Sequence, residues 1–137
     1  MTLPGYSATP LVRKLGWREG DRVALFDAPP EYAAWLGPAA AGLELVVDPR
    51  GRFAAGHLFA TARARLGRDL ARLRERIEPA GTLWVSWPKK SSGVATDVTE
   101  DTIRELALPL GWVDVKVCAV TEVWSGLKLV IRRSARC

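Results

Sequence analysis

At 137 residues the chain has the usual size of one domain, and folding at this length removes roughly two-thirds of the unfolded surface from water. A composition of 48% hydrophobic and 26% charged residues excludes both a disordered chain and a disulfide scaffold. The net charge of +5 comes almost wholly from arginines in one predicted helix and in the tail 131–137, which indicates an ordinary basic surface. We expect a single domain over 1–137, with an arm and a short helix at 1–20.

The sequence shows no segment that addresses a membrane or an export route. No apolar run approaches the roughly 20 residues of a membrane span, and residues 1–10 lack the basic start and apolar centre of a signal peptide. Two cysteines, Cys118 and Cys137, do not make a secreted disulfide framework, so reduced thiols are expected. We therefore expect a cytoplasmic protein without membrane contact, and the sequence leaves open whether it forms a homo-oligomer.

Short apolar runs alternate with helical patterns along the chain. Runs such as 22–27 predict parallel strands covered on both faces, and Pro30 and Thr99 suit the first turns of helices. In chain order the sequence predicts a helix over 10–15, a strand over 22–27, a helix over 30–36, strands over 43–47 and 55–60, a helix over 61–77, a strand over 82–87, a helix over 99–110, and strands over 113–124 and 127–133.

This order of elements predicts the architecture. Strands that alternate with helices form a mostly parallel sheet with right-handed crossovers, and the last two strands add an antiparallel hairpin joined through 125–126. The fold class is therefore α/β, a three-layer Rossmann-like domain with a sheet of about six strands.

The helix predicted over 61–77 is the clearest on the chain. Leu66, Leu70, Leu73 and Ile77 form one apolar stripe, and six arginines mostly lie elsewhere on the helix. A solvated surface is the simple explanation of these arginines. Nucleic-acid binding through this arginine-rich helix is the second alternative function that the sequence leaves open.

The candidate ligand site lies at the carboxyl ends of the predicted strands, where open parallel sheets bind ligands. Lysine ammonium groups, serine hydroxyls and the backbone near a glycine suit a phosphate or a carboxylate, and an indole suits a pocket wall. The predicted ligand-binding residues are Trp87, Lys89, Lys90, Ser91, Ser92, Gly93, Asp27, Glu31, Tyr32 and Asp48. The leading hypothesis is a non-catalytic or regulatory module that binds a small anionic ligand at this edge.

The residues assign no catalytic group, metal or cofactor. His57, the one histidine, lies within a predicted strand, which favours a hydrogen-bonded structural ring over a general base. The sequence contains neither a Gly-x-Ser-x-Gly elbow nor a phosphate loop, and one histidine with two distant cysteines does not make a zinc site. Whether the chain is an enzyme stays open at this stage.

Two segments of the chain carry resemblances to known families. The segment WVSWPKKSSGVATD at 84–97, together with 113–120 and 124–127, resembles a family of small bacterial proteins of unknown function. The segment 20–27, the aspartate Asp48 after the second strand and the terminal hairpin resemble methyltransferases that use S-adenosylmethionine. That resemblance implies a methyltransferase-like fold, with the cofactor against Asp27 and Asp48, and makes a divergent methyltransferase the alternative function.

The chain departs from those enzymes at the turn after the first strand. They carry a glycine-rich turn that lets the backbone approach the cofactor, whereas this chain has Ala28, Pro29 and Pro30. The chain is also shorter by one strand–helix unit.

Overall fold

The structure, a computed structural model, describes residues 9–136, so the arm at 1–8 and Cys137 lie outside the described part. The α-helices are α1 (Leu11–Leu15), α2 (Tyr32–Leu36), α3 (Arg63–Arg74) and α4 (Glu100–Ala107). The strands are β1 (Arg22–Phe26), β2 (Glu44–Val47), β3 (Phe53–Phe59), β4 (Ile77–Pro88), β5 (Trp112–Ala119) and β6 (Trp124–Ile131). Short 3-10 helices cover Gly37–Gly42, Lys90–Ser92, Leu108–Leu110 and Arg133–Ala135.

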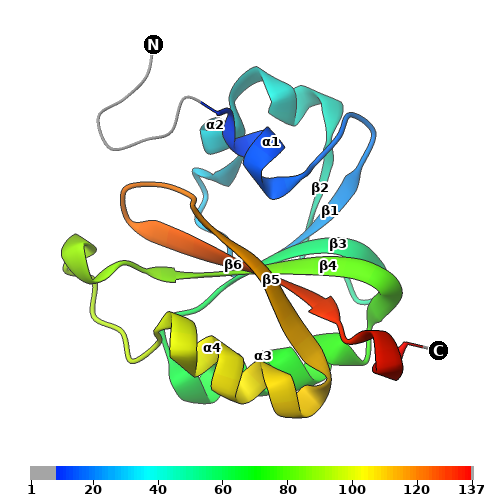
Figure 1. Cartoon of the computed structure of the whole chain (residues 1–137). Helices are drawn as coiled ribbons and strands as arrows, with labels where there is room; N and C mark the ends of the chain where they lie inside the picture. The colour runs from blue at the N-terminus through cyan, green and yellow to red at the C-terminus, as the bar shows by residue number, and fades with distance from the viewer. Residues whose placement is uncertain (1–8, 137) are drawn as a thin grey trace.

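All six strands form one sheet in the order β2-β1-β3-β4-β6-β5. Strands β1 to β4 run parallel, whereas β6 is antiparallel to both β4 and β5. Helices α1 and α2 cover one face and helices α3 and α4 cover the other, which gives three layers (Figure 1). The predicted α/β class, the number of strands and the antiparallel hairpin are confirmed.

The alternation of side chains along β1 divides the core into two apolar layers. Val23 and Leu25 pack against α1 and α2, whereas Ala24 and Phe26 pack on the α3 side. All four are buried, as the continuous apolar run predicts for a strand covered on both faces. Among residues 9–136, no helix combines the length and the apolar character that crossing a membrane requires.

The start of β4 differs from the prediction. The sequence predicts a helix that reaches Ile77, but α3 ends at Arg74 and Ile77 already pairs with Phe53 in the sheet. The register then shifts, so the segment between Ile77 and Thr82 bulges out of the pairing. A Cβ on Gly81 would lie 2.9 Å from the carbonyl oxygen of Ala54, so this glycine permits a close approach between strands.

The turn of the terminal hairpin was also placed wrongly. Residues 125–126 lie inside β6, and the chain reverses over 120–123, where the Thr121 hydroxyl accepts hydrogen bonds from the backbone of Val123 and Trp124. Gly126 is needed for packing, because a Cβ there would lie 3.1 Å from the indole of Trp84. A glycine that suggests a turn in the sequence is thus a contact point in the fold.

The start of α4 has the cap that the sequence predicts at Thr99. Thr99 and Thr102 form a reciprocal capping box at this terminus. The nearby Asp97 accepts a hydrogen bond of 2.6 Å from the backbone N–H of Arg63. It therefore tethers the loop before α4 to the start of α3.

His57 lies at the centre of a buried hydrogen-bonded chain on the α1 side of the sheet. Trp17 donates to the Tyr32 hydroxyl at 3.2 Å, and Tyr32 contacts His57 Nδ1 at 2.8 Å. On the other side of the ring, Nε2 lies 2.7 Å from the Ser86 hydroxyl, so a neutral imidazole donates through one nitrogen and accepts through the other. The ring is fully buried, which lowers the pKa of His57 to about 3. Its structural role, predicted from the sequence, agrees with these contacts.

This burial predicts a pH dependence of folding. Between the ordinary histidine pKa of 6.5 and the folded value of about 3, the unfolded chain binds a proton that the folded chain does not. Stability therefore falls as the pH falls through this window, by about 1.4 kcal/mol per pH unit. Urea unfolding at several pH values between about 7 and about 5 measures this slope.

The matched variant is His57→Gln, whose amide keeps a donor and an acceptor but does not titrate. We expect the variant to be less stable at neutral pH and to lose the slope. Equal slopes in the two proteins would show that His57 is protonated in the folded state.

Candidate functional site

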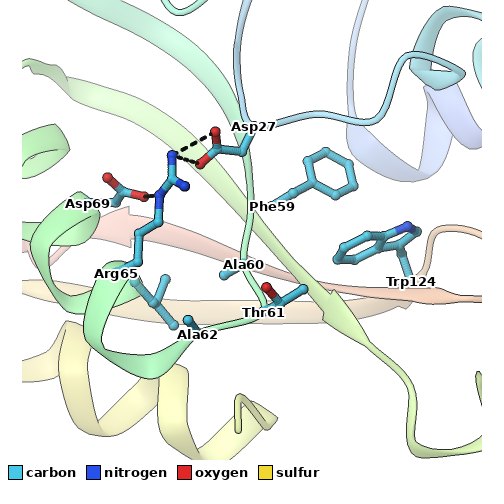
Figure 2. Close-up of a pocket in the computed structure, with 9 residues that line it drawn as sticks. Asp27, Phe59, Ala60, Thr61, Ala62, Arg65, Asp69 and Trp124 are labelled. Carbon is cyan, nitrogen blue, oxygen red and sulfur yellow. Dashed lines mark hydrogen bonds and ion pairs between the residues drawn. The ribbon is translucent and has the colours of Figure 1, made fainter. Parts of the chain in front are cut away.

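A pocket opens at the carboxyl ends of β1 and β3 (Figure 2). These strands are neighbours in the sheet, and the chain leaves them toward opposite faces, into α2 and α3. Such a reversal is where open α/β sheets bind ligands. The pocket has a volume of about 220 Å³ and is lined by Asp27, Phe59, Ala60, Thr61, Ala62, Arg65, Leu66, Asp69 and Trp124.

Two aromatic rings form one wall of the pocket. Phe59 and Trp124 meet edge to face, with ring centroids 5.0 Å apart, and Figure 2 shows both on the side away from the charged residues. Phe59 also stacks on His57, with centroids 4.5 Å apart. The buried chain through His57 therefore holds the inner aromatic wall in place.

Alternating charges form the opposite wall. Arg65 of α3 lies between two carboxylates, 2.9 Å from Asp27 and 3.8 Å from Asp69 (Figure 2). Asp69 also contacts Arg72 at 3.2 Å, and Arg72 reaches Asp48 at 3.9 Å. This row, which we call the charge ladder (Asp27, Arg65, Asp69, Arg72, Asp48), connects α3 to the ends of β1 and β2.

Both aspartates at the strand ends have left-handed backbone conformations. Asp27 has a φ of 57° and Asp48 a φ of 46°, a region that aspartate tolerates better than most residues. Each follows directly after its strand, so the reversal of the backbone carries the carboxylate to the carboxyl edge of the sheet. After Asp27, the N–H of Tyr32 bonds to the carbonyl of Pro29 at 3.0 Å, and the turn enters α2.

The predicted acidic and aromatic site residues do not all lie at the pocket. Asp27 lines the pocket, and Asp48 connects to it through the charge ladder. Tyr32 is buried in the chain with His57 and does not line the pocket. Glu31 is exposed just before α2.

The predicted basic loop at 89–93 lies at the end of β4, outside the set of pocket-lining residues. Ser92 donates its hydroxyl to the carbonyl of Lys89 at 2.6 Å and accepts from the N–H of Val94 at 3.2 Å. Its groups are thus used within the loop. Trp87 is 8% exposed and packs in the core on the α3 side. The structure therefore does not bring this loop and Trp87 together with Asp27.

The prediction of site residues missed Phe59, Arg65, Asp69 and Trp124. A signal was present for part of the ladder, because Arg65, Asp69 and Arg72 follow at i, i+4 and i+7 with alternating charge and so share one helix face. Trp124 and Phe59 carry no such pattern. Their meeting depends on β6 lying two strands away from β3.

The arginine-rich helix is largely engaged inside the chain. Arg65 and Arg72 belong to the ladder, Arg63 pairs with Glu105 at 2.9 Å, and Arg68 has no partner among residues 9–136. Arg74 donates to the carbonyls of Leu110 and Ala135, and Arg76 donates to the carbonyl of Pro49. This arrangement does not favour the second alternative from the sequence, a nucleic-acid surface on this helix.

Neither protein-family models nor curated proteins match the sequence, so the resemblance to a small bacterial family gains no support. Solved structures do share the fold. An O-methyltransferase from neocarzinostatin biosynthesis, in complex with S-adenosylmethionine, superimposes with a TM-score of 0.63 at 14% identity, over 82% of this chain and 49% of that one. The chain has the methyltransferase-like Rossmann fold. It spans about half the length of that O-methyltransferase.

Two further methyltransferase-fold structures agree. The CcbJ methyltransferase from Streptomyces caelestis has a TM-score of 0.54 at 8% identity, over 89% of this chain and 87% of that one. A ribosomal-protein methylase from Lactobacillus delbrueckii subsp. bulgaricus has a TM-score of 0.54 at 10% identity, over 90% and 76%. At these identities the likeness shows the fold alone.

These comparisons correct the leading hypothesis from the sequence. A non-catalytic module for a small anion at the strand ends was wrong as the main interpretation, because the solved neighbours are methyltransferases. The basic loop that motivated it also uses its serine within the loop. The alternative given from the sequence, a divergent methyltransferase, has the better support.

The charge ladder predicts a stability effect. Asp69 has a side chain 13% exposed between two guanidinium groups, so Asp69→Asn leaves those cations facing each other and should lower the free energy of unfolding by about 1 kcal/mol. Urea unfolding measures the change. The control is Glu105→Gln, which removes an exposed partner of Arg63 and should cost at most about 0.5 kcal/mol. Equal costs would mean that the carboxylate of Asp69 stabilises the fold no more than an exposed ion-pair partner does.

Proposed function

We propose that the chain is a methyltransferase that binds S-adenosylmethionine in the pocket between β1 and β3. The observation that carries this proposal is the position of the pocket. In a methyltransferase-like sheet it lies at the reversal of strand order, beside an aspartate that directly follows β1. The neocarzinostatin enzyme, which has this fold, was solved with that cofactor.

The side chains of the pocket fit the chemistry of the cofactor. S-adenosylmethionine carries two cationic groups, a sulfonium and an ammonium, beside a carboxylate. Asp27 and Asp69 offer carboxylates to the cations, and Arg65 offers a guanidinium to the carboxylate. Phe59 and Trp124 offer aromatic rings, which attract a cation such as the sulfonium.

The volume of the pocket and the turn after β1 restrict how the cofactor can be bound. A pocket of about 220 Å³ is smaller than usual ligand pockets, so it accommodates one end of the cofactor. Pro29 and Pro30 provide no N–H donors, so the side chains of Asp27 and Arg65 would take over the role that a glycine-rich backbone has elsewhere. Asp48, at the end of β2, is the residue we assign to the ribose hydroxyls.

When bound, the cofactor supplies an electrophilic methyl group. The residues of this chain would orient it by exchanging the internal contacts of Arg65, Asp27 and Asp69 for contacts with a zwitterion. The aromatic wall excludes water from one side of the pocket. Thr61, which is exposed at the end of β3, adds a hydroxyl at the pocket for the methyl acceptor.

Calorimetric titration with S-adenosylmethionine and its demethylated product tests the proposal. We expect both to bind wild type, and Asp27→Asn to weaken binding by about tenfold because a charged contact is lost. Glu105→Gln removes the same charge from a residue outside the pocket and should leave the affinity unchanged. No heat with either compound at millimolar concentration would contradict the proposal, as would equal weakening by the two variants.

A further inference from the structure

The sheet face on the α1 side changes from covered to open between β4 and β6. Trp84, Lys128 and Lys116 lie side by side across β4, β6 and β5. The indole of Trp84 is fully buried and donates to the carbonyl of Leu15 at 2.9 Å, so α1 covers it. Lys128 is half-buried and Lys116 is exposed. Across these three strands the face is therefore covered by α1 at β4 and open at β5.

Two lysines face each other directly on this open surface. Lys116 and Lys128 are register partners in an antiparallel pair, an arrangement that brings facing Cβ atoms to about 4.5–5.5 Å. Like charges at this spacing destabilise a sheet. Such a pair therefore lowers the stability of the folded chain.

A third ammonium group lies close to this pair. Lys14 of α1 donates to the carbonyl of Ala119, next to Cys118, at 3.0 Å. Burial raises the pKa of the Cys118 thiol, and the charges of Lys14 and Lys116 oppose that increase, so both lie near the sulfur. We call Lys14, Lys116 and Lys128 the lysine face.

Helix α1 and strands β5 and β6, which carry these lysines, contribute no acidic side chain to this face. Strands β5 and β6 contain one acid, Asp114, which binds Arg104 of α4 at 3.0 Å and so lies on the opposite face. No ion pair within the described part of the chain includes a residue of the lysine face. Residues 1–8 contain no acidic side chain either.

We propose that the lysine face binds an acidic segment of another polypeptide. An open sheet face is flat, whereas small-molecule sites are concave, so the surface suits a macromolecule. Val113 and Val130 are register partners on the same face and half-buried, and they give the side chains of a peptide an apolar contact. The net charge of +5 disfavours a second copy of this chain as the partner.

A nucleic acid fits the same surface less well. Binding of that kind relies on a long track of phosphate contacts or on exposed aromatic rings that stack on bases. Three lysines on one small area do not make such a track, and the arginines of α3 are mostly engaged internally. The proposal is also independent of cofactor binding, because Arg65 and Asp27 of the pocket do not belong to the lysine face.

Fluorescence anisotropy with a labelled oligoglutamate peptide tests the proposal, using the whole chain without cofactor at low and at physiological salt. We expect the double variant K116Q/K128Q to bind the peptide at least about tenfold more weakly than wild type. The control is K89Q/K90Q, which removes the same charge from a loop at the end of β4 and should change the affinity less than about twofold.

The proposal is overturned if both double variants weaken peptide binding equally, since the net charge of the chain alone would then explain the binding. It is also overturned if oligothymidylate binds more tightly than oligoglutamate. Thermal unfolding adds a second readout: K116Q/K128Q should raise the Tm by removing the repulsion, whereas K89Q/K90Q should not. A fall in the Tm for K116Q/K128Q would contradict the premise that the facing lysines are uncompensated.

Discussion

The burial of the second half of β4, from Leu83 to Pro88, is the constraint on which the other elements depend. From Leu83 to Trp87 its side chains are at most 8% exposed and point alternately into the two apolar layers, so both helical layers pack on this strand. Its neighbours differ in direction, with β3 parallel and β6 antiparallel. Because a shift of one residue would exchange the two faces, this burial determines the register of the sheet. It thereby places Trp124 of β6 near Phe59 of β3.

A polar chain within the apolar layer connects the core to the pocket. His57 has both ring nitrogens hydrogen-bonded, to Tyr32 and Ser86, and stacks on Phe59. A buried network of this kind stabilises one arrangement when all of its members have partners. The orientation of the pocket wall therefore depends on residues that no ligand touches. On the α3 side, the charge ladder likewise holds the opposite wall of the pocket in place.

Local patterns predicted the fold well, because apolar runs such as 22–27 and the cap at Thr99 act within a few residues. The errors lie at the start of β4 and at the terminal hairpin, where Gly81 and Gly126 are required by close packing against atoms distant in sequence. The site was predicted only in part. Asp27 follows from its position after a strand, whereas the pairing with Arg65 depends on how α3 is rotated against the sheet, which sequence spacing alone does not determine.

Helix α1 illustrates how a short element is held in such a fold. With five residues it is too short to persist alone in water, so it depends on its contacts with the sheet. The bond from the Trp84 indole to Leu15 and the bond from Lys14 to Ala119 attach it at two points. Leu15 also packs in the same apolar layer as Trp84, so displacing α1 requires the loss of this packing as well as of the two bonds. Such a displacement would uncover an indole next to Lys128 and would join an apolar ring to the basic surface.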